Sequence, residues 1–175
     1  MTTGKPVRPH SLRIIVGLVL AVAGANAAPA ATGGVAGVSA NVAKPLILTW
    51  LQNLDLGTIV LGPGTWSGAT VQISRAGAFS CTNINLTCSG ATQVARYNVS
   101  GSNNNVVHIT APNVTLVNQS DATKTLTLVV DNPGTVTLTN SGPPGTNFSL
   151  GGSVVLSSAT AGGTYSGTFN VTVDY

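Results

Sequence analysis

The chain contains no glutamate, and only 6% of its 175 residues are charged. Exposed helix surfaces normally carry glutamate, lysine, arginine and glutamine, so this scarcity argues against a mainly helical protein. Hydrophobic residues make up 43% of the chain, which is too many for a disordered one. Threonine, serine, asparagine and glycine supply most of the polar positions, and threonine and valine favour strands. The composition therefore predicts an all-β protein.

The beginning of the chain accounts for its net positive charge and has the pattern of an export signal. Residues 1–13 contain three of the seven lysine and arginine side chains, and residues 14–24 (IIVGLVLAVAG) are uncharged and apolar. Small residues follow at Ala25 and Ala27, the two positions that a signal peptidase reads. The apolar run is shorter than the stretch of about 20 residues that spans a bilayer. We predict a cleavable signal peptide over residues 1–27, with an uncleaved N-terminal anchor as the alternative.

Cleavage after residue 27 would leave an exported chain, in the periplasm, at the cell surface or outside the cell, with no net charge. It would keep four lysine and arginine side chains against four aspartates. Such a surface has no basic patch for nucleic acid or anionic lipid, so neither is expected as a partner. Low charge also favours self-association, because it removes the repulsion between copies. No later apolar run is long enough to predict a membrane span in the mature chain.

Residues 28–43 (APAATGGVAGVSANVA) are small and uncharged, and we predict that they form a flexible N-terminal extension. Within this extension Val38, Ala40 and Val42 alternate with smaller or more polar residues, which is the pattern of a weak strand.

From residue 44 to the end, short runs with period-2 alternation are separated by glycine, proline and asparagine. About eight to ten such runs, spaced about 8–12 residues apart, are typical of a β-sandwich or barrel. No stretch has sustained helical periodicity, which argues against an α/β enzyme fold. The last run, residues 164–175, has one face made of Tyr165, Phe169, Val171, Val173 and Tyr175.

Cys81 and Cys88 are the only cysteines, and export would bring them into an oxidising compartment in which they form a disulfide. A bridge across so short a loop stabilises a fold by about 2–3 kcal/mol. Together with His108, the one histidine beyond the leader, they are too few ligands for a metal site. His108 is expected on a strand face, and no serine lies in a nucleophile-elbow motif. We therefore expect no catalytic site, no metal and no cofactor.

Two stretches of the chain resemble a bacterial secreted family, domain of unknown function 4402. Residues 54–60 (LDLGTIV) resemble its opening, LDFGTI, with Leu56 where phenylalanine is usual. Residues 162–175 (GGTYSGTFNVTVDY) resemble its ending, GTYSGTFTVTVNY. The resemblance covers roughly residues 45–175, and the cysteine pair is extra to it. The family is in turn similar to spore-coat protein U and to pilins of the chaperone–usher group.

This resemblance implies an incomplete immunoglobulin-like antiparallel β-sandwich over residues 44–175, whose missing strand comes from the N-terminal extension of the next subunit. Such pilins carry a glycine fourteen residues from the end and a penultimate aromatic residue; Gly162 matches the glycine, and Tyr175 is the last residue rather than the penultimate one. An amphipathic last strand offers an edge with which a chaperone can pair. The implied partners are a periplasmic chaperone, an usher and further subunits, and the implied assembly strands are residues 38–42 and 165–175.

Two hypotheses about function follow. The first is a non-catalytic, pilin-like structural subunit of a bacterial surface appendage or coat, which assembles by strand addition. The alternative interpretation of the same segments is that residues 165–175 form an ordinary core strand and that the N-terminal extension is a disordered tail. The second is a stand-alone secreted adhesin or carbohydrate-binding module, with Trp50 or Trp66 as its aromatic platform. Isolated tryptophans in a β-sandwich are more often part of the core, which favours the first hypothesis.

Overall fold

The computed structural model describes residue 33 and residues 35–175 of the chain, so the predicted signal peptide lies outside the described residues. The contacts divide the chain at Ser39, and Ala40–Tyr175 form one unit. The described residues before β1 have no regular secondary structure, and Val38, Ala40 and Val42 are exposed.

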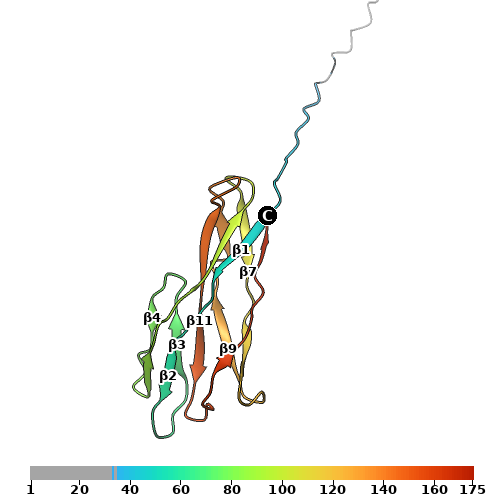
Figure 1. Ribbon diagram of the computed structural model, residues 1–175. Helices are drawn as coiled ribbons and strands as arrows, with labels where there is room; N and C mark the ends of the chain where they lie inside the picture. The colour runs from blue at the N-terminus through green and yellow to red at the C-terminus, as the bar shows by residue number, and fades with distance from the viewer. Residues whose placement is uncertain (1–32, 34) are drawn as a thin grey trace, which may run out of the picture. The chain divides into compact units, whose positions relative to one another are not determined.

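All regular structure in the described residues is β-strand, as the composition predicts. The strands are β1 (Ile47–Gln52), β2 (Thr58–Leu61), β3 (Ala69–Ile73), β4 (Phe79–Ser80), β5 (Leu86–Ser89), β6 (Ala95–Ser100), β7 (Val106–Thr110), β8 (Val114–Asn118), β9 (Thr125–Asp131), β10 (Thr135–Thr137), β11 (Thr146–Leu156), β12 (Tyr165–Ser166) and β13 (Thr172–Asp174). Every pairing is antiparallel (Figure 1).

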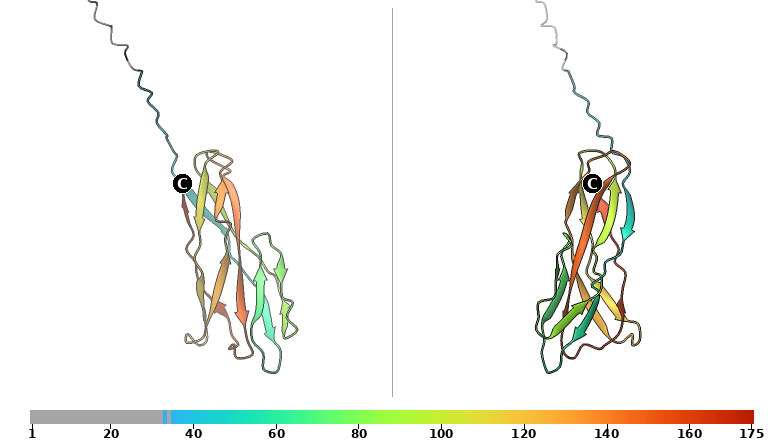
Figure 2. Two further views of the ribbon diagram at one scale, coloured as in Figure 1. Left: turned by 180° about the vertical axis from the view of Figure 1, so that it is seen from behind. Right: turned by 60° about the vertical axis from the view of Figure 1, so that its left-hand side comes forward.

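The strands form a β-sandwich. One layer contains β1, β6 and β11, with β3 and β4 continuing beside β11. The other layer contains three chain segments, each split into two short strands: β7 with β8, β9 with β10, and β12 with β13. Side chains from β6 and β11 pack against side chains from β7, so the two layers face each other (Figure 2).

The core of the sandwich consists of two clusters. In the first, the rings of Tyr97 and Phe148 stack with their centroids 5.5 Å apart, next to the fully buried Val99 and Leu150. The second cluster lies between β3, β5, β8, β9 and β11. β11 contributes Phe148 and Leu150 to the first cluster and Val154 and Leu156 to the second. All four side chains are on the same face, because every second residue of a strand points the same way, and the strand is long enough to reach both clusters.

β11 is the strand that joins the two layers. Residues 146–150 pair with β6, and residues 152–156 pair with β3. Gly152 pairs with Ile73 of β3 on one edge and with Val130 of β9 on the other, so a strand of each layer flanks it. A Cβ on Gly151 would collide with the backbone of β3, and one on Gly152 would lie 2.8 Å from the Leu128 side chain. Glycine is therefore required at position 151, whereas a side chain at position 152 would need Leu128 to shift.

The strands depart from simple alternation at three places. Residues 75–91 contain β4 and β5, which are only two and four residues long. Within residues 54–60 the strand begins only at Thr58, because Gly57 adopts a φ of +73°. In the last run, residues 164–175, only β12 and β13 are paired.

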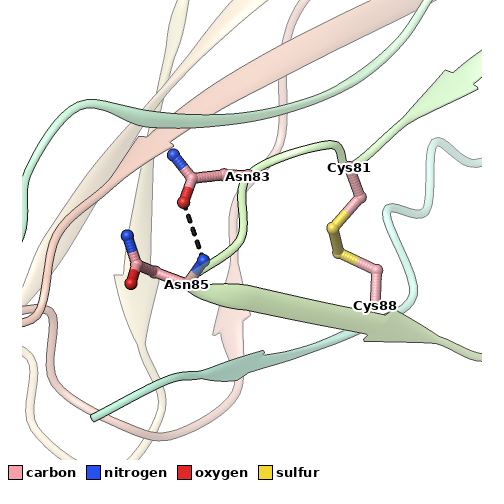
Figure 3. The surroundings of a disulfide bond; sticks show 4 residues. All are labelled: Cys81, Asn83, Asn85 and Cys88. Carbon is pink, nitrogen blue, oxygen red and sulfur yellow. Dashed lines mark hydrogen bonds between the residues drawn. A yellow bond between two sulfur atoms is a disulfide. The ribbon is translucent and has the colours of Figure 1, made fainter.

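The predicted disulfide is confirmed: Cys81 and Cys88 are bonded, with their Cα atoms 6.3 Å apart (Figure 3). The turn between them is held by the Asn83 side chain, whose Oδ1 accepts a hydrogen bond of 2.9 Å from the Asn85 amide. Both cysteines pack against the second core cluster, so the bridge ties β5 to the end of β4 beside that core.

Replacement of both cysteines by serine should leave the fold intact and lower the free energy of unfolding by about 2–3 kcal/mol, because the unfolded chain gains the freedom of the opened loop. Calorimetry of the oxidised protein with and without reductant measures the same effect as a lower melting temperature. The double serine variant is the control, since its melting temperature should not respond to reductant. An oxidised protein that melts at the same temperature as the reduced one would contradict the prediction.

Candidate functional site

An open groove runs between two segments that come from opposite ends of the domain. Residues 52–59, between β1 and β2, form one wall, and residues 160–169, around β12, form the other. Its floor consists of Ala95 and Tyr97 of β6, Leu116 of β8, Leu126 and Leu128 of β9, and Val154 and Leu156 of β11. The groove has a volume of about 920 Å³, the size of a large ligand pocket.

The floor of the groove is core that the domain does not fully cover. Leu128, Val154 and Leu156 are buried, whereas Leu116 and Leu126 beside them stay partly exposed. All five belong to or pack against the second core cluster. A sandwich normally covers such side chains with another strand, so this surface is suited to bind one.

The walls of the groove offer strand edges that are not paired within the described chain. β1, whose Trp50 and Gln52 line the groove, pairs only with β6, and β12 pairs only with β8. Between β12 and β13, residues 167–171 belong to no strand. Unpaired backbone amides and carbonyls at an edge are a template for pairing with an additional strand.

The wall at residues 160–169 is held in place by Asn118, the one buried polar residue among those described. Its Nδ2 donates a hydrogen bond of 3.0 Å to the Gly162 carbonyl, and its Oδ1 accepts hydrogen bonds from the amides of Ser120 and Asp121. Gly163 has a φ of +140°, and a Cβ there would lie 2.5 Å from the Asn118 side chain. The wall therefore depends on both the amide and the glycine.

Asn118 was not identified from the sequence, although a signal for it exists. Asn118 lies two and four residues after Leu116 and Val114, so its side chain is on the same face of β8 as theirs, which point inward. Strand periodicity alone therefore places an amide on the inner face, where it needs hydrogen-bond partners.

The groove is almost uncharged. Among its lining residues within the described chain, Asp55 is the one charged side chain, and its Oδ1 accepts a hydrogen bond of 2.8 Å from the Gly57 amide. Burial raises the pKa of the Tyr97 hydroxyl, so this side chain is neutral at neutral pH. Outside the groove, hydrogen bonds from the hydroxyl and amide of Thr123 lower the pKa of Asp121. The groove, with Asp55 as its one charged lining residue, therefore suits an uncharged, partly apolar ligand.

Acidic, histidine and cysteine side chains do not gather elsewhere in the part of the chain that the structure covers. No three of them lie close enough to hold a metal ion there. No helix that could cross a membrane occurs over the same residues. His108 is exposed on β7, as expected for a polar residue on a strand face.

The predicted assembly residues of the last strand divide between two places. Gly162, Tyr165 and Phe169 line the groove. Val171 and Val173 pack against the first core cluster instead. The predicted alternation is confirmed, because Tyr165, Phe169, Val171 and Val173 are all partly buried while the residues between them are exposed.

Two other predicted residues differ from expectation. Tyr175 continues the alternation but is 44% exposed, and its hydroxyl makes hydrogen bonds at the far end of β13. Trp50 is 58% exposed and lines the groove, so the expectation that it is a core residue is wrong. Trp66 does pack against the second core cluster, and its indole N–H donates to the Gly62 carbonyl.

Replacement of Asn118 by alanine should lower the free energy of unfolding by about 1–3 kcal/mol, because buried partners of the amide lose their hydrogen bonds. The amides of residues 161–165 should also exchange hydrogen faster, since the wall is no longer held. Denaturant unfolding and hydrogen–deuterium exchange measure the two effects. Asn170 is exposed and serves as the matched control, for which alanine should change stability by less than about 0.5 kcal/mol. Equal effects at the two positions would refute this role for Asn118.

Comparison with known proteins gives one match. No curated protein and no solved structure is similar enough to this chain to be informative. The sequence profile of a family described as Domain of unknown function (DUF4402) matches residues 46–175, which contain every strand and both walls of the groove. Because the match covers most of the chain, the protein belongs to this family.

Proposed function

We propose that the protein is a non-catalytic structural subunit of a bacterial surface appendage or coat, and that it assembles by β-strand addition into the groove. The resemblance to pilins and spore-coat protein U supports this proposal, as does the export signal expected at residues 1–27. The observation that carries it is the half-covered core between two unpaired strand edges.

The groove is large enough to receive part of a strand, since its volume of about 920 Å³ is that of a large ligand pocket. The alternating part of the extension, residues 38–42, is the segment we propose for it.

The extension has the properties expected of the added strand. Val38 and Val42 are 95% and 87% exposed, so neither side chain is buried by the rest of the described chain. Residues 28–43 carry no charge, which suits them to a groove with a single carboxylate. Before assembly the groove would expose apolar side chains, and a periplasmic chaperone that pairs with the same edges would cover them until an usher exchanges it for the extension.

A double replacement in the extension tests the proposal. Val38→Asp with Val42→Asp should abolish assembly of the mature protein, because two charges would have to enter an apolar groove. Ser39→Asp with Asn41→Asp adds the same charge to the opposite side of the strand and should leave assembly largely intact. Light scattering and electron microscopy of the proteins, co-expressed with their chaperone and usher, measure the outcome. Assembly that is lost equally in both variants, or that survives deletion of residues 28–43, would rule out strand addition by the extension.

A second candidate function rests on Trp50. This side chain is 58% exposed and lines the groove, as do Gln52 and Asn53. An exposed indole beside amides is a surface on which a sugar ring can stack and form hydrogen bonds. The protein would then be a carbohydrate-binding module or adhesin, with Trp50 rather than Trp66 as the platform.

A glycan array separates this candidate from the first. If it is correct, the monomer binds a glycan and Trp50→Ala abolishes binding without a change in melting temperature. Trp66→Ala is the comparison, because it should lower the melting temperature instead by removing packing from the second core cluster. An array with no bound glycan would exclude the carbohydrate-binding function for the glycans presented.

A further inference from the structure

A second, smaller cavity lies on the opposite face of the sheet from the groove. Thr49 of β1 and Asn98 of β6, which pair with each other, line this cavity. The next pair along, Trp50 and Tyr97, lines the groove instead. Successive residues of a strand point to opposite faces, so a strand bound in the groove would leave this cavity uncovered. We call it the Lys44 pocket; its lining includes Lys44, Ile47, Thr49, Asn98, Ser100 and residues 141–144.

The Lys44 pocket has a volume of about 350 Å³, near the lower end of the range for small-molecule sites. One side is the loop of residues 141–144, which precedes β11 at the end of the domain where β1 begins (Figure 1). Two hydrogen bonds hold this loop against the sheet. The Asn98 Nδ2 donates one of 2.8 Å to the Pro144 carbonyl, and the Lys44 Nζ donates one of 2.9 Å to the Ser141 carbonyl. The pocket is therefore formed before any ligand arrives.

The cation of the pocket extends from an anchored backbone. The Lys44 amide donates a hydrogen bond of 2.6 Å to the Ser102 hydroxyl, and its carbonyl accepts one from the Tyr175 hydroxyl. No acidic side chain of the described chain lines the pocket. The one ion pair among the described residues joins Arg75 to Asp131, so Lys44 has no carboxylate partner there. Its ammonium group is thus available to an anion.

The rest of the lining combines apolar and hydrogen-bonding surface. Ile47 is 61% exposed, and the rings of Pro143 and Pro144 lie across the pocket on the loop. Thr49 and Ser100 contribute hydroxyl groups from the sheet. Such a lining matches a sugar ring, whose C–H face packs on apolar side chains while its hydroxyls form hydrogen bonds. A carboxylate suits the single lysine, whereas a phosphate is more often bound by the fork of an arginine.

A second cation lies on the same face of the sheet. Arg96 is exposed and comes two residues before Asn98 on β6, so the two side chains point the same way, about 6.6 Å apart along the strand. No acidic residue occurs in β1, β3, β6 or β11. A ligand with repeated negative charges therefore meets no repulsion as it passes from the pocket towards Arg96.

We propose that the Lys44 pocket binds one acidic sugar residue, a hexuronate ring whose carboxylate pairs with the Lys44 ammonium group, and that a chain of such residues continues along β6 to Arg96. The ligand is thus an acidic polysaccharide, of which the pocket holds one unit. This inference goes beyond the proposed function, because the pocket and the groove share no lining residue. A subunit whose groove is filled keeps its pocket open to the polysaccharide.

The test is a titration of ¹⁵N-labelled mature protein followed by NMR. Galacturonate should shift the amide signals of Ser100, Gly101 and Gly142, with a dissociation constant of about 1 mM. Galactose, which lacks the charge, and acetate, which lacks the ring, should each bind at least about tenfold more weakly. Trigalacturonate should bind at least about tenfold more tightly than the monosaccharide, because a second unit reaches Arg96.

Matched variants separate the charge from the fold. Ile47→Asp places a carboxylate in the pocket and should weaken galacturonate binding at least about tenfold, whereas Ile47→Asn, of the same size, should stay within about threefold of the parent. Ile84→Asp makes the same change outside the pocket, at a side chain that is 98% exposed, and should have no effect. Lys44→Gln should weaken binding at least about tenfold, and Lys44→Arg should retain it. Arg96→Gln should lower the affinity for trigalacturonate and leave that for galacturonate unchanged.

Each alternative result has a definite meaning. Equal affinity for galactose and galacturonate, or signals that shift in the groove instead of the pocket, would overturn the inference. Binding that Lys44→Gln and Ile47→Asp leave unchanged would overturn it as well. Trigalacturonate that binds no more tightly than the monosaccharide would refute an extended polysaccharide as the ligand. The double variant Val38→Asp with Val42→Asp should bind like the parent, so a failure of assembly and a failure of this site are distinguishable.

Discussion

The architecture depends on β11, which belongs to both layers of the sandwich. Gly152 pairs with β3 on one edge and β9 on the other, and a side chain at the neighbouring Gly151 would collide with the backbone at the end of β3. This shared strand closes the sandwich along one side. The opposite side, between β1 and the C-terminal segment, has no equivalent strand among the described residues, and the groove lies there. The sandwich is therefore closed on the side of β11 and open on the side of β1 and the C-terminal segment.

The edges of the groove lack one device that usually prevents strands from pairing, which is charge along the strand, although β1 has a register irregularity between Trp50 and Gln52 and β12 is only two residues long. Soluble proteins protect exposed edges with lysine, proline or inward-pointing charges. β1 carries no charge, and residues 164–173 carry none either. The same scarcity of charge that identifies an all-β composition therefore also leaves these edges receptive to another strand, and export with a covering partner would answer that hazard.

Much of the fold was predictable because strand periodicity is local. Alternation identified the inward face of residues 165–173, and the two cysteines predicted their own bond. Strands as short as β4 and β5 have too few residues for a period to be visible. Trp50 was misplaced because β1 pairs only with β6, and strand alternation does not reveal which face of a strand stays uncovered.

The strand-rich composition, the balance of four basic against four acidic side chains beyond residue 27, the disulfide and the apolar alternation of both terminal segments could all be predicted from the residues alone. That residues 52–59 and 160–169 face each other across an open groove follows from the tertiary structure, since about a hundred residues separate them. The same holds for the contact between Lys44 and Tyr175, which are 131 residues apart. Periodicity assigns a side chain to a face, but which edges meet and which stay open depends on how the layers close.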